Sequence, residues 1–483
     1  MRFKPGAAVA LARRTHPIEW VGAIERPVRP NAPTKLSAEL AATTPLARVA
    51  DAALLLLAAL LPFETTRAAF SVAGFRFTNV EIVLFITLLL GAAALAIDPA
   101  RRARVRACIP RTWVLLLGAF ALWAFVGALQ APAFEPAALR AAARTSVGLA
   151  LIPLAVASLP TGRDLGRLAA AVSVGALLSA LAGLIEVLSD EALGWLQWFR
   201  PNETYQGSIR RLSGPFDHSN IAAMFFEVAI PLVAALAWVA WRRGRSLAAA
   251  AGATLVLVVL EALVLTYSRG GIAGVVVSNA VVAALIALGK AEVRRRLVPA
   301  ASVAVLAAAV IAVDLGASST ARTAIRRESS PDPRGHLTRS GADSRESAPP
   351  VLARHELWRA AFHLVRRRPV TGIGLDTFRL TYGPVIGLRQ WDKRQHSNSL
   401  YVETLVSLGV VGAVVFFAWL ALLVVDIGMT LVRAGDVWQG AVAAGLLAYL
   451  VHQVVDYFLL FSATGLLFWL LCGSWLAARR ASP

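Results

Sequence analysis

Residues 395–403 read Gln395-His396-Ser397-Asn398-Ser399-Leu400-Tyr401-Val402-Glu403, and within them a long polar stretch passes into a long apolar one. The polar stretch covers residues 314–398 and carries 15 Lys and Arg against 8 Asp and Glu. Because apolar runs flank it on both sides, we expect it to form a large loop outside a hydrophobic layer. The remainder of the chain then serves as a membrane scaffold for this loop.

The composition is that of a membrane protein. The chain has 483 residues, of which 57% are hydrophobic, and its mean hydropathy is +0.64. Soluble proteins contain about 45–50% apolar residues. Many separate apolar runs of about 18–22 residues match the length of a spanning helix, and their continuous Ala, Leu and Val favour helices over strands. The sequence therefore predicts an all-α, polytopic bundle of about 12 spans. The expected spans are 49–63, 80–97, 113–130, 141–159, 165–188, 219–241, 247–266, 270–288, 297–313, 400–425, 437–460 and 462–478.

The formal charge of +19 would suggest a nucleic-acid partner in a soluble chain. In a membrane protein, Lys and Arg collect in short cytoplasmic loops, so the lipid bilayer is the expected partner and nucleic acid is not. Basic residues cluster at 101–111, 242–245 and 290–296, and these loops share one side if the N-terminus is cytoplasmic. Both termini are then cytoplasmic, and residues 189–218, Arg269 and the large loop face outwards.

Four segments follow from this pattern. They are a disordered cytoplasmic tail (1–48), spans one to nine (49–313), the large outer loop (314–398), and spans ten to twelve (399–478). Within the loop, apolar residues at helical spacing predict a short amphipathic helix over 351–367, which Pro369 ends. The cysteines, Cys108 and Cys472, are too far apart in this topology to pair.

Three arginines are candidate ligands for a phosphate group. Arg269 lies in a tight outer turn between two apolar runs, where an arginine is costly unless it is paired or faces a polar cavity. Arg211, or Arg210 beside it, precedes a Ser-Gly-Pro turn and a helix start. If Arg211, Arg269 and Arg354 converge, their guanidinium groups are suited to a diphosphate.

His396 is the candidate for proton transfer, because an imidazole titrates near neutral pH. His218, His355 and His363 are rivals in similar positions. Glu403 lies in the first turns of an apolar run, where a carboxylate is expected to face the protein interior or a wet cavity. No cofactor or metal site is predicted, since no residues have metal-ligand spacing. His452 and Asp456 are spaced to share a helix face, and we interpret them as a structural pair.

At these stretches the sequence resembles the O-antigen ligase and polymerase superfamily of bacterial membrane glycosyltransferases. The matching elements are Arg211-x-Ser-Gly-Pro-Phe with Asn220, Ser268-Arg269-Gly270, Arg354-x3-Trp358 with Pro369 and Gly372-x-Gly374, and Tyr401-x-Glu403 with Gly409 and Gly412. The resemblance covers residues 205 to 425. It implies transfer of a glycan from an undecaprenyl diphosphate carrier to a saccharide or to lipid A–core.

The resemblance also implies a location and site residues. The protein is then a multi-pass protein of the bacterial inner membrane with its active site on the periplasmic face, acting with polysaccharide chain-length or export proteins. Arg211 and Arg269 are implied to contact the diphosphate, and His396 is implied to be the catalytic histidine. Arg354, Asn398 and Glu403 are the further candidates for substrate binding. The sequence departs from the family at one place: the usual His-Asn pair falls on Asn398-Ser399. This departure favours a polymerase over a ligase, and Asp217, His218 or Glu403 is the base if His396 is not.

A second class of function fits the span count. A bundle of about 12 helices also suits a transporter or flippase of lipid-linked or polyanionic substrates. Such proteins show internal repeats and broken helices at the membrane midplane. The two halves of this chain share no such similarity, and its polar residues gather at the outer surface.

Overall fold

The computed structural model describes residues 44–72, 75–131, 134–189, 193–206, 209–289 and 352–481. Residues 1–43 of the predicted tail (1–48) and the whole of the predicted loop before residue 352 therefore lie outside the described residues, whereas residues 45–48 already belong to the first helix. The helices are α2 (Pro45–Leu60), α3 (Asn79–Ile97), α4 (Pro99–Cys108), α5 (Arg111–Leu129), α6 (Glu135–Leu149), α7 (Leu151–Ser158), α8 (Gly162–Ser189), α9 (Ser219–Arg242), α10 (Ser246–Leu265), α11 (Arg269–Gly289), α14 (Arg354–Arg367), α15 (Phe378–Val385), α16 (Leu400–Ala434), α17 (Val437–His452) and α18 (Ser462–Ala481). The 3-10 helices are η1 (Leu61–Phe63) and η2 (Gly194–Trp198).

Two short antiparallel hairpins interrupt the helices. The strands β1 (Phe70–Val72) and β2 (Phe75–Phe77) form the first, and β3 (Thr204–Gln206) and β4 (Ile209–Arg211) form the second. Neither hairpin was predicted, because each strand has three residues and is too short to show a sequence period. The fold remains all-α in class.

Nine helices in the described residues are long and apolar enough to cross a membrane. They coincide with nine of the twelve expected spans, with α6 and α7 together forming the fourth, so the predicted polytopic helical fold is confirmed. Of the other three spans, 297–313 lies outside the described residues. The expected span 437–460 is the shorter helix α17, and 462–478 is α18.

The prediction for 437–460 is wrong at its C-terminal end, because α17 ends at His452. The residues that follow form turns, and the carbonyls of Gln453 and Asp456 both accept the N–H of Leu400, at 2.9 and 3.1 Å. The backbone groups of this loop are thus satisfied without a helix. His452 and Asp456 therefore do not share a helix face, and Asp456 lies in the loop.

The core lies along α9, which is the most enclosed of the nine spans, with 78% of the residues in its apolar stretch buried. Aromatic side chains of α16 and α18 fill the adjoining space. Trp419 packs on Trp469 and Phe468 at centroid distances of 5.5 and 6.1 Å. In contrast, only 17% and 22% of the residues in the apolar stretches of α10 and α11 are buried, and the others are partly or fully exposed, as expected beside lipid.

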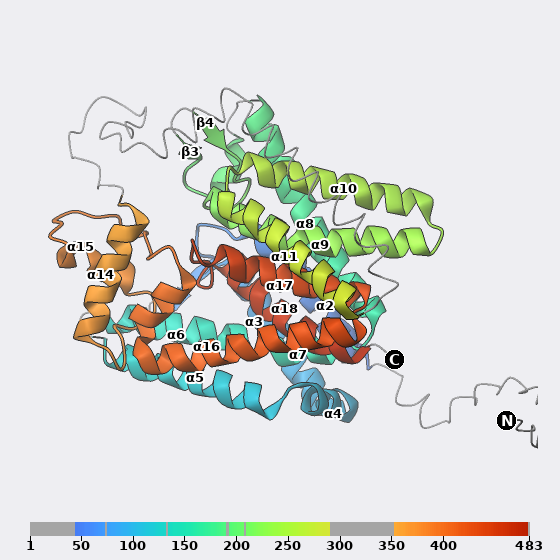
Figure 1. Ribbon diagram of the computed structural model, residues 1–483, viewed down its shortest axis with the longest axis horizontal. Coiled ribbons are helices and arrows are strands. Elements are labelled where there is room, and N and C mark those ends of the chain that lie inside the picture. The colour runs from blue at the N-terminus through green and yellow to red at the C-terminus, as the bar shows by residue number, and fades with distance from the viewer. Residues whose placement is uncertain are drawn as a thin grey trace, which may run out of the picture. The chain divides into compact units, whose positions relative to one another are not determined.

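The predicted loop helix is confirmed as α14, which ends at Arg367, two residues before Pro369. A second short helix, α15, follows it. Leu357 and Leu364 of α14, Phe378 of α15 and Val406 of α16 are buried in one small apolar cluster. Figure 1 shows α14 and α15 at one end of the long helices, and basic α4 and the α9–α10 turn at the other.

The segment after α14 crosses α16 at a break in that helix. Gly409 has φ +66° and ψ −173°, so α16 is interrupted there, and the adjoining backbone groups bond to the crossing segment. The hydrogen bonds run from Val410 N–H to Pro369, from Ile373 N–H to Val406 and from Gly374 N–H to Ser407, at 2.7, 3.1 and 2.9 Å. A Cβ on Gly372 would lie 2.5 Å from the Gly409 nitrogen, so the two backbones approach this closely only with glycine. This contact fixes the position of the segment that follows, residues 375–398.

Candidate active site

A pocket of about 750 Å³, the polar pocket, lies where loops meet at the α14 end of the helices. Its walls come from α6, residues 202–205 and 217–221, the start of α14, residues 376–398 and the loop 456–461. The arginines that line it are Arg140, Arg144, Arg354, Arg379 and Arg394. The acidic residues are Glu203, Asp217, Asp376, Asp392 and Asp456, and the histidines are His218 and His396. Fixed cations and a titratable imidazole thus face one cavity.

The structure brings together only part of the predicted site. Arg354, His396 and Asn398 line the polar pocket. Arg211, Arg269 and Glu403 are not among its lining residues. The first three residues can therefore contact a substrate bound in the polar pocket, whereas the other three can act on it only through neighbouring residues.

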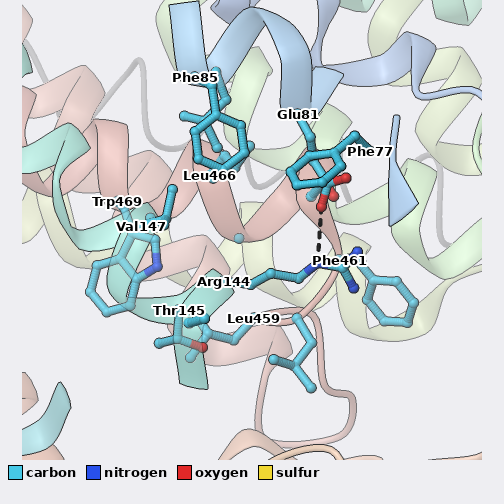
Figure 2. Close-up of a pocket in the computed structure, with 16 residues that line it drawn as sticks. Phe77, Glu81, Phe85, Arg144, Thr145, Val147, Leu459, Phe461, Leu466 and Trp469 are labelled. Carbon is cyan, nitrogen blue, oxygen red and sulfur yellow. Dashed lines mark hydrogen bonds and ion pairs between the residues drawn. The ribbon is translucent and has the colours of Figure 1, made fainter. Parts of the chain in front are cut away.

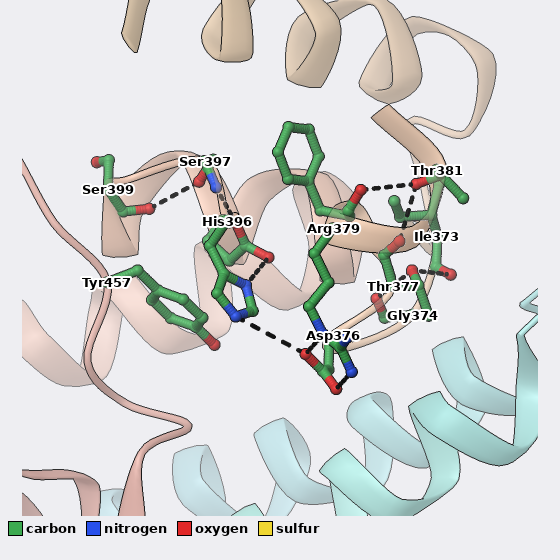
Figure 3. Close-up of polar contacts among 12 residues, drawn as sticks. Ile373, Gly374, Asp376, Thr377, Arg379, Thr381, His396, Ser397, Ser399 and Tyr457 are labelled. Atoms are coloured by element: carbon green, nitrogen blue, oxygen red, sulfur yellow. Dashed lines mark hydrogen bonds and ion pairs between the residues drawn. The ribbon is translucent and has the colours of Figure 1, made fainter. Parts of the chain in front are cut away.

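His396 is held between two carboxylates, and Figure 3 shows Asp376 on one side of its ring. Its Nδ1 lies 3.4 Å from Oε1 of Glu403, and its Nε2 lies 3.9 Å from Oδ1 of Asp376. Glu403 is fully buried in the first turn of α16, and its other oxygen accepts the backbone N–H of Ser397 at 2.8 Å. The ring of Tyr457 packs edge-on against the imidazole at 5.2 Å. Glu403 thus faces the protein interior, as predicted, and orients His396 from behind.

The surroundings of His396 raise its pKa above the ordinary value for histidine. Burial alone lowers the pKa, because it disfavours the charged imidazolium. The hydrogen bond to Glu403 and the charges of Glu403 and Asp376 together outweigh burial and the opposing charge of Arg379. His396 therefore binds a proton more readily than a free histidine does.

Asp376 is a site residue that sequence reasoning missed. Arg379 bonds both of its oxygens, at 2.6 and 2.7 Å, and donates a further bond to the carbonyl of Lys393 at 2.8 Å. This fork fixes the carboxylate beside Nε2 of His396. The available signal was an acidic residue directly after Gly372-Ile-Gly374-Leu, with an arginine three positions later.

Left-handed backbone conformations gather around this region. Among the described residues, Tyr267, Asp376 and Asn398 are the non-glycine residues with positive φ, at 51°, 62° and 53°. Two of them line the polar pocket, and Tyr267 is two residues before Arg269. Such strain persists only where surrounding contacts impose it, and it concentrates at functional sites.

Arg211 lies behind the pocket wall in a polar chain. Its guanidinium donates to the carbonyl of Thr266 and to the side-chain oxygen of Asn220, both at 2.7 Å. Asn220 donates in turn to Asp456 at 2.7 Å, and both of these residues line the pocket. Arg211 therefore positions pocket residues. Arg210 has a different partner, because it pairs with Glu203 of the pocket lining at 3.1 Å.

The turn that presents Arg269 rests on a buried polar chain. The hydroxyl of Ser268 lies 3.3 Å from Nε2 of His452, whose Nδ1 lies 3.1 Å from Glu227. A Cβ on Gly270 would meet the His452 ring at 2.4 Å, so the turn requires glycine at this position. Arg269 itself is exposed at the start of α11. The Ser-Arg-Gly motif thus fixes the turn against α17.

The rival histidines differ in position. His218 lines the polar pocket and precedes α9, where its Nδ1 accepts the backbone N–H of Asn220 at 3.1 Å. That nitrogen therefore acts as a helix cap. His355 and His363 are exposed on α14 and do not line the pocket.

Arg140 and Arg144 are further lining residues that were not predicted. They are one helical turn apart on the same face of α6. Nε of Arg144 lies 2.9 Å from Glu81 of α3, and about half of the arginine side chain remains exposed, at 51%. The sequence did contain a signal for this polar cavity, because Arg144 lies within an expected span.

The described residues contain no group of three or more His, Cys, Asp or Glu side chains that could hold a metal ion. The arrangement instead presents arginines for an anion and an imidazole for a proton.

Comparison with protein families gives one match. Residues 254–417 match the family model described as O-antigen ligase. The matched segment contains Arg269, Arg354, Asp376, His396 and Glu403, and the match is consistent with the resemblance predicted from the sequence. No curated protein matches the chain.

Proposed function

We propose that this membrane protein of the O-antigen ligase and polymerase superfamily takes a glycan from a polyprenyl diphosphate carrier and transfers it to a saccharide hydroxyl. The observation that carries this proposal is the polar pocket, whose lining includes five arginines and an oriented histidine. A diphosphate carries several negative charges, and guanidinium groups bind phosphate oxygens in pairs. Undecaprenyl diphosphate is the carrier that the family resemblance implies.

The proposed reaction is a displacement at the anomeric carbon. The bond between this carbon and the carrier's phosphate oxygen breaks, and the carrier diphosphate leaves with the electron pair. A bond forms from the acceptor hydroxyl oxygen to the same carbon. Preorganised arginines stabilise the charge that develops on the leaving group, and their effect is large in a cavity with little water.

In this reaction His396 receives the hydroxyl proton at Nε2. Glu403 accepts the Nδ1–H, which leaves the lone pair of Nε2 directed towards the pocket and Asp376. Glu403 also stabilises the imidazolium that forms, as a carboxylate behind a catalytic histidine does elsewhere. Glu403 is thus a positioning residue in place of the substrate ligand that the sequence suggested.

Arg354 and Asn398 are the predicted substrate-binding residues that line the pocket. Arg354 also donates from Nε to the carbonyl of Val455 at 3.0 Å, which places its guanidinium beside the loop that carries Asp456. We propose that Arg354 binds the donor directly. Arg211 then acts through Asn220, and Arg269 through the turn that it begins.

The proposed setting is the bacterial inner membrane, with the polar pocket on the periplasmic face. The acceptor is then another carrier-linked glycan in a polymerase, or lipid A–core in a ligase. The unusual Asn398-Ser399 pair keeps polymerase as our preferred assignment. Polysaccharide chain-length or export proteins are the partners that a polymerase would have.

Reconstitution tests the reaction. Purified protein in vesicles, given carrier-linked glycan alone, is expected to lengthen the glycan on its carrier, which gel electrophoresis would resolve as a ladder. Transfer only after lipid A–core is added would identify a ligase. If the glycan crosses the bilayer without forming any new glycosidic bond, the protein is a transporter and the proposal is wrong.

Topology is tested by cysteine labelling, with Cys108 and Cys472 first replaced by serine. A membrane-impermeant maleimide applied to spheroplasts is expected to label Arg359→Cys on α14 and to leave Arg106→Cys on α4 unlabelled. Both positions are exposed in the structure. The expectation rests on the basic residues of α4, which favour the cytoplasmic side. The reverse labelling pattern would place the polar pocket in the cytoplasm.

A further inference from the structure

A second pocket, of about 240 Å³, lies beside the polar pocket and has different chemistry. We call it the apolar groove. Its walls come from β2 and α3, from α6, and from the segment 459–469. Figure 2 shows Phe85, Val147, Leu466 and Trp469 around it. A surface of this kind suits a hydrocarbon chain.

The apolar groove and the polar pocket meet at shared residues. Arg144, Leu460 and Phe461 line both cavities. Arg144 is held at this junction by Glu81, the ion pair marked in Figure 2. Arg140, one turn earlier on α6, lines only the polar pocket. An apolar space thus opens beside a pair of guanidinium groups.

The apolar groove also borders the surface expected to face lipid. Phe85 lines it and is 39% exposed, and its neighbours Ile86 and Leu89 on α3 are more exposed still. Apolar side chains that are exposed on a spanning helix face lipid. A chain in the apolar groove therefore has a short route into the bilayer.

We infer that the apolar groove receives the first isoprenoid units of the donor's carrier, and that Arg144 and Arg140 hold the adjoining phosphate. This inference rests on the proposed function. In a polyprenyl diphosphate the phosphate is bonded directly to the isoprenoid chain, so a donor whose phosphates lie in the polar pocket needs an apolar exit next to them. The junction at Arg144 supplies that exit. Pockets for whole drug-sized ligands span about 300–1,000 Å³, so the apolar groove holds only the start of the chain.

Photolabelling of the unmodified protein tests the location. The probe is farnesyl diphosphate with a diazirine at its far end, applied to protein in phosphatidylcholine nanodiscs. Adducts are expected on peptides that contain Phe85, Val147 or Leu466, and excess undecaprenyl diphosphate should suppress them while phosphatidylglycerol does not. Adducts confined to other helices would overturn the inference. Equal suppression by phosphatidylglycerol would also overturn it, because the apolar groove would then hold any lipid chain.

Variants test whether the apolar groove binds the hydrocarbon chain while Arg144 binds the phosphate. Val147→Trp fills the apolar groove and is expected to weaken farnesyl diphosphate binding by about tenfold or more, because several buried carbons are lost, while inorganic diphosphate binds as before. Arg144→Gln should weaken both ligands. Leu89→Trp, on the 71%-exposed site of α3, is the matched control and should change neither. Ala143→Leu, a smaller change in the same wall, replaces Val147→Trp if that variant does not fold.

The two proposals fail in different ways. If both groove-filling variants bind farnesyl diphosphate with unchanged affinity, the apolar groove is not the isoprenoid site, even if wild-type protein transfers glycan. If wild-type protein transfers no glycan while the apolar groove is labelled as expected, the glycosyltransferase assignment is wrong and the binding site stands.

Discussion

His396→Ala is expected to slow glycan transfer by on the order of 10²–10⁴, which is the usual contribution of a positioned general base. The affinity for carrier-linked glycan should change little, because the arginines of the polar pocket bind the donor and the imidazole acts on the acceptor. Single-turnover transfer and donor binding, measured on the same preparation in nanodiscs, separate the two effects.

A variant of the neighbouring Asn398 tests which residue acts as the base, because the family's usual histidine falls on position 398 in this chain. Its φ of +53° is one that glycine adopts without strain, so Asn398→Gly removes the amide and keeps the backbone. If Asn398→Gly abolishes transfer while His396→Ala is nearly normal, the family's histidine position carries the chemistry and our assignment of the base is wrong. If neither variant is slowed, the base must be sought at Asp217 or His218.

Glu403→Gln is expected to be nearly as damaging as loss of His396 itself. The backbone N–H of Ser397 needs an acceptor, so the glutamine oxygen must face it and the amide NH₂ must face His396. Nδ1 then becomes an acceptor and the proton moves to Nε2, which can no longer receive one. A carboxylate-to-amide change that inverts a catalytic histidine's tautomer costs about 10⁴ in rate. Transfer assays with Glu356→Gln, a carboxylate that caps α14 and does not line the polar pocket, provide the matched control.

The same pair determines the pH dependence. Transfer needs the neutral imidazole, and the pKa of His396 is raised, so the wild-type rate should rise with pH through a value above about 6.5. Glu403→Gln removes the strongest of the influences that raise this pKa, so its residual activity should rise at lower pH than the wild type. If the transfer rate of Glu403→Gln rises over the same pH range as that of the wild type, His396 does not set the pH profile.

The membrane helices were predictable because each must satisfy its own backbone groups in lipid, which demands long apolar runs. The end of α17 was not. Residues 453–461 are apolar enough to continue a helix, but contacts with the start of α16 satisfy their backbone groups in another way. Hydropathy reports the solvent around a segment and carries no information about such distant backbone partners.

In the candidate site, too, some residues could be predicted from local sequence and others depend on distant contacts. His396 and Glu403 are seven residues apart, and their local sequence was enough to single out both. Asp376 and Arg140 approach the pocket from other elements, and only the packing of α6 and of the segment before α15 puts them there. Arg211 was recognised by its motif, but its task of holding Asn220 depends on the fold around it.

The crossing at Gly372 and Gly409 has a consequence for making chimaeras. Three backbone hydrogen bonds join residues 369–374 to residues 406–410, and the close approach leaves no space for a Cβ on either glycine. A donor segment that stopped at residue 399 would therefore have to fit a foreign helix break to within a few tenths of an ångström. The smallest exchangeable cassette that includes α14 and His396 runs from residue 354 through 410, and grafts between family members should be cut there.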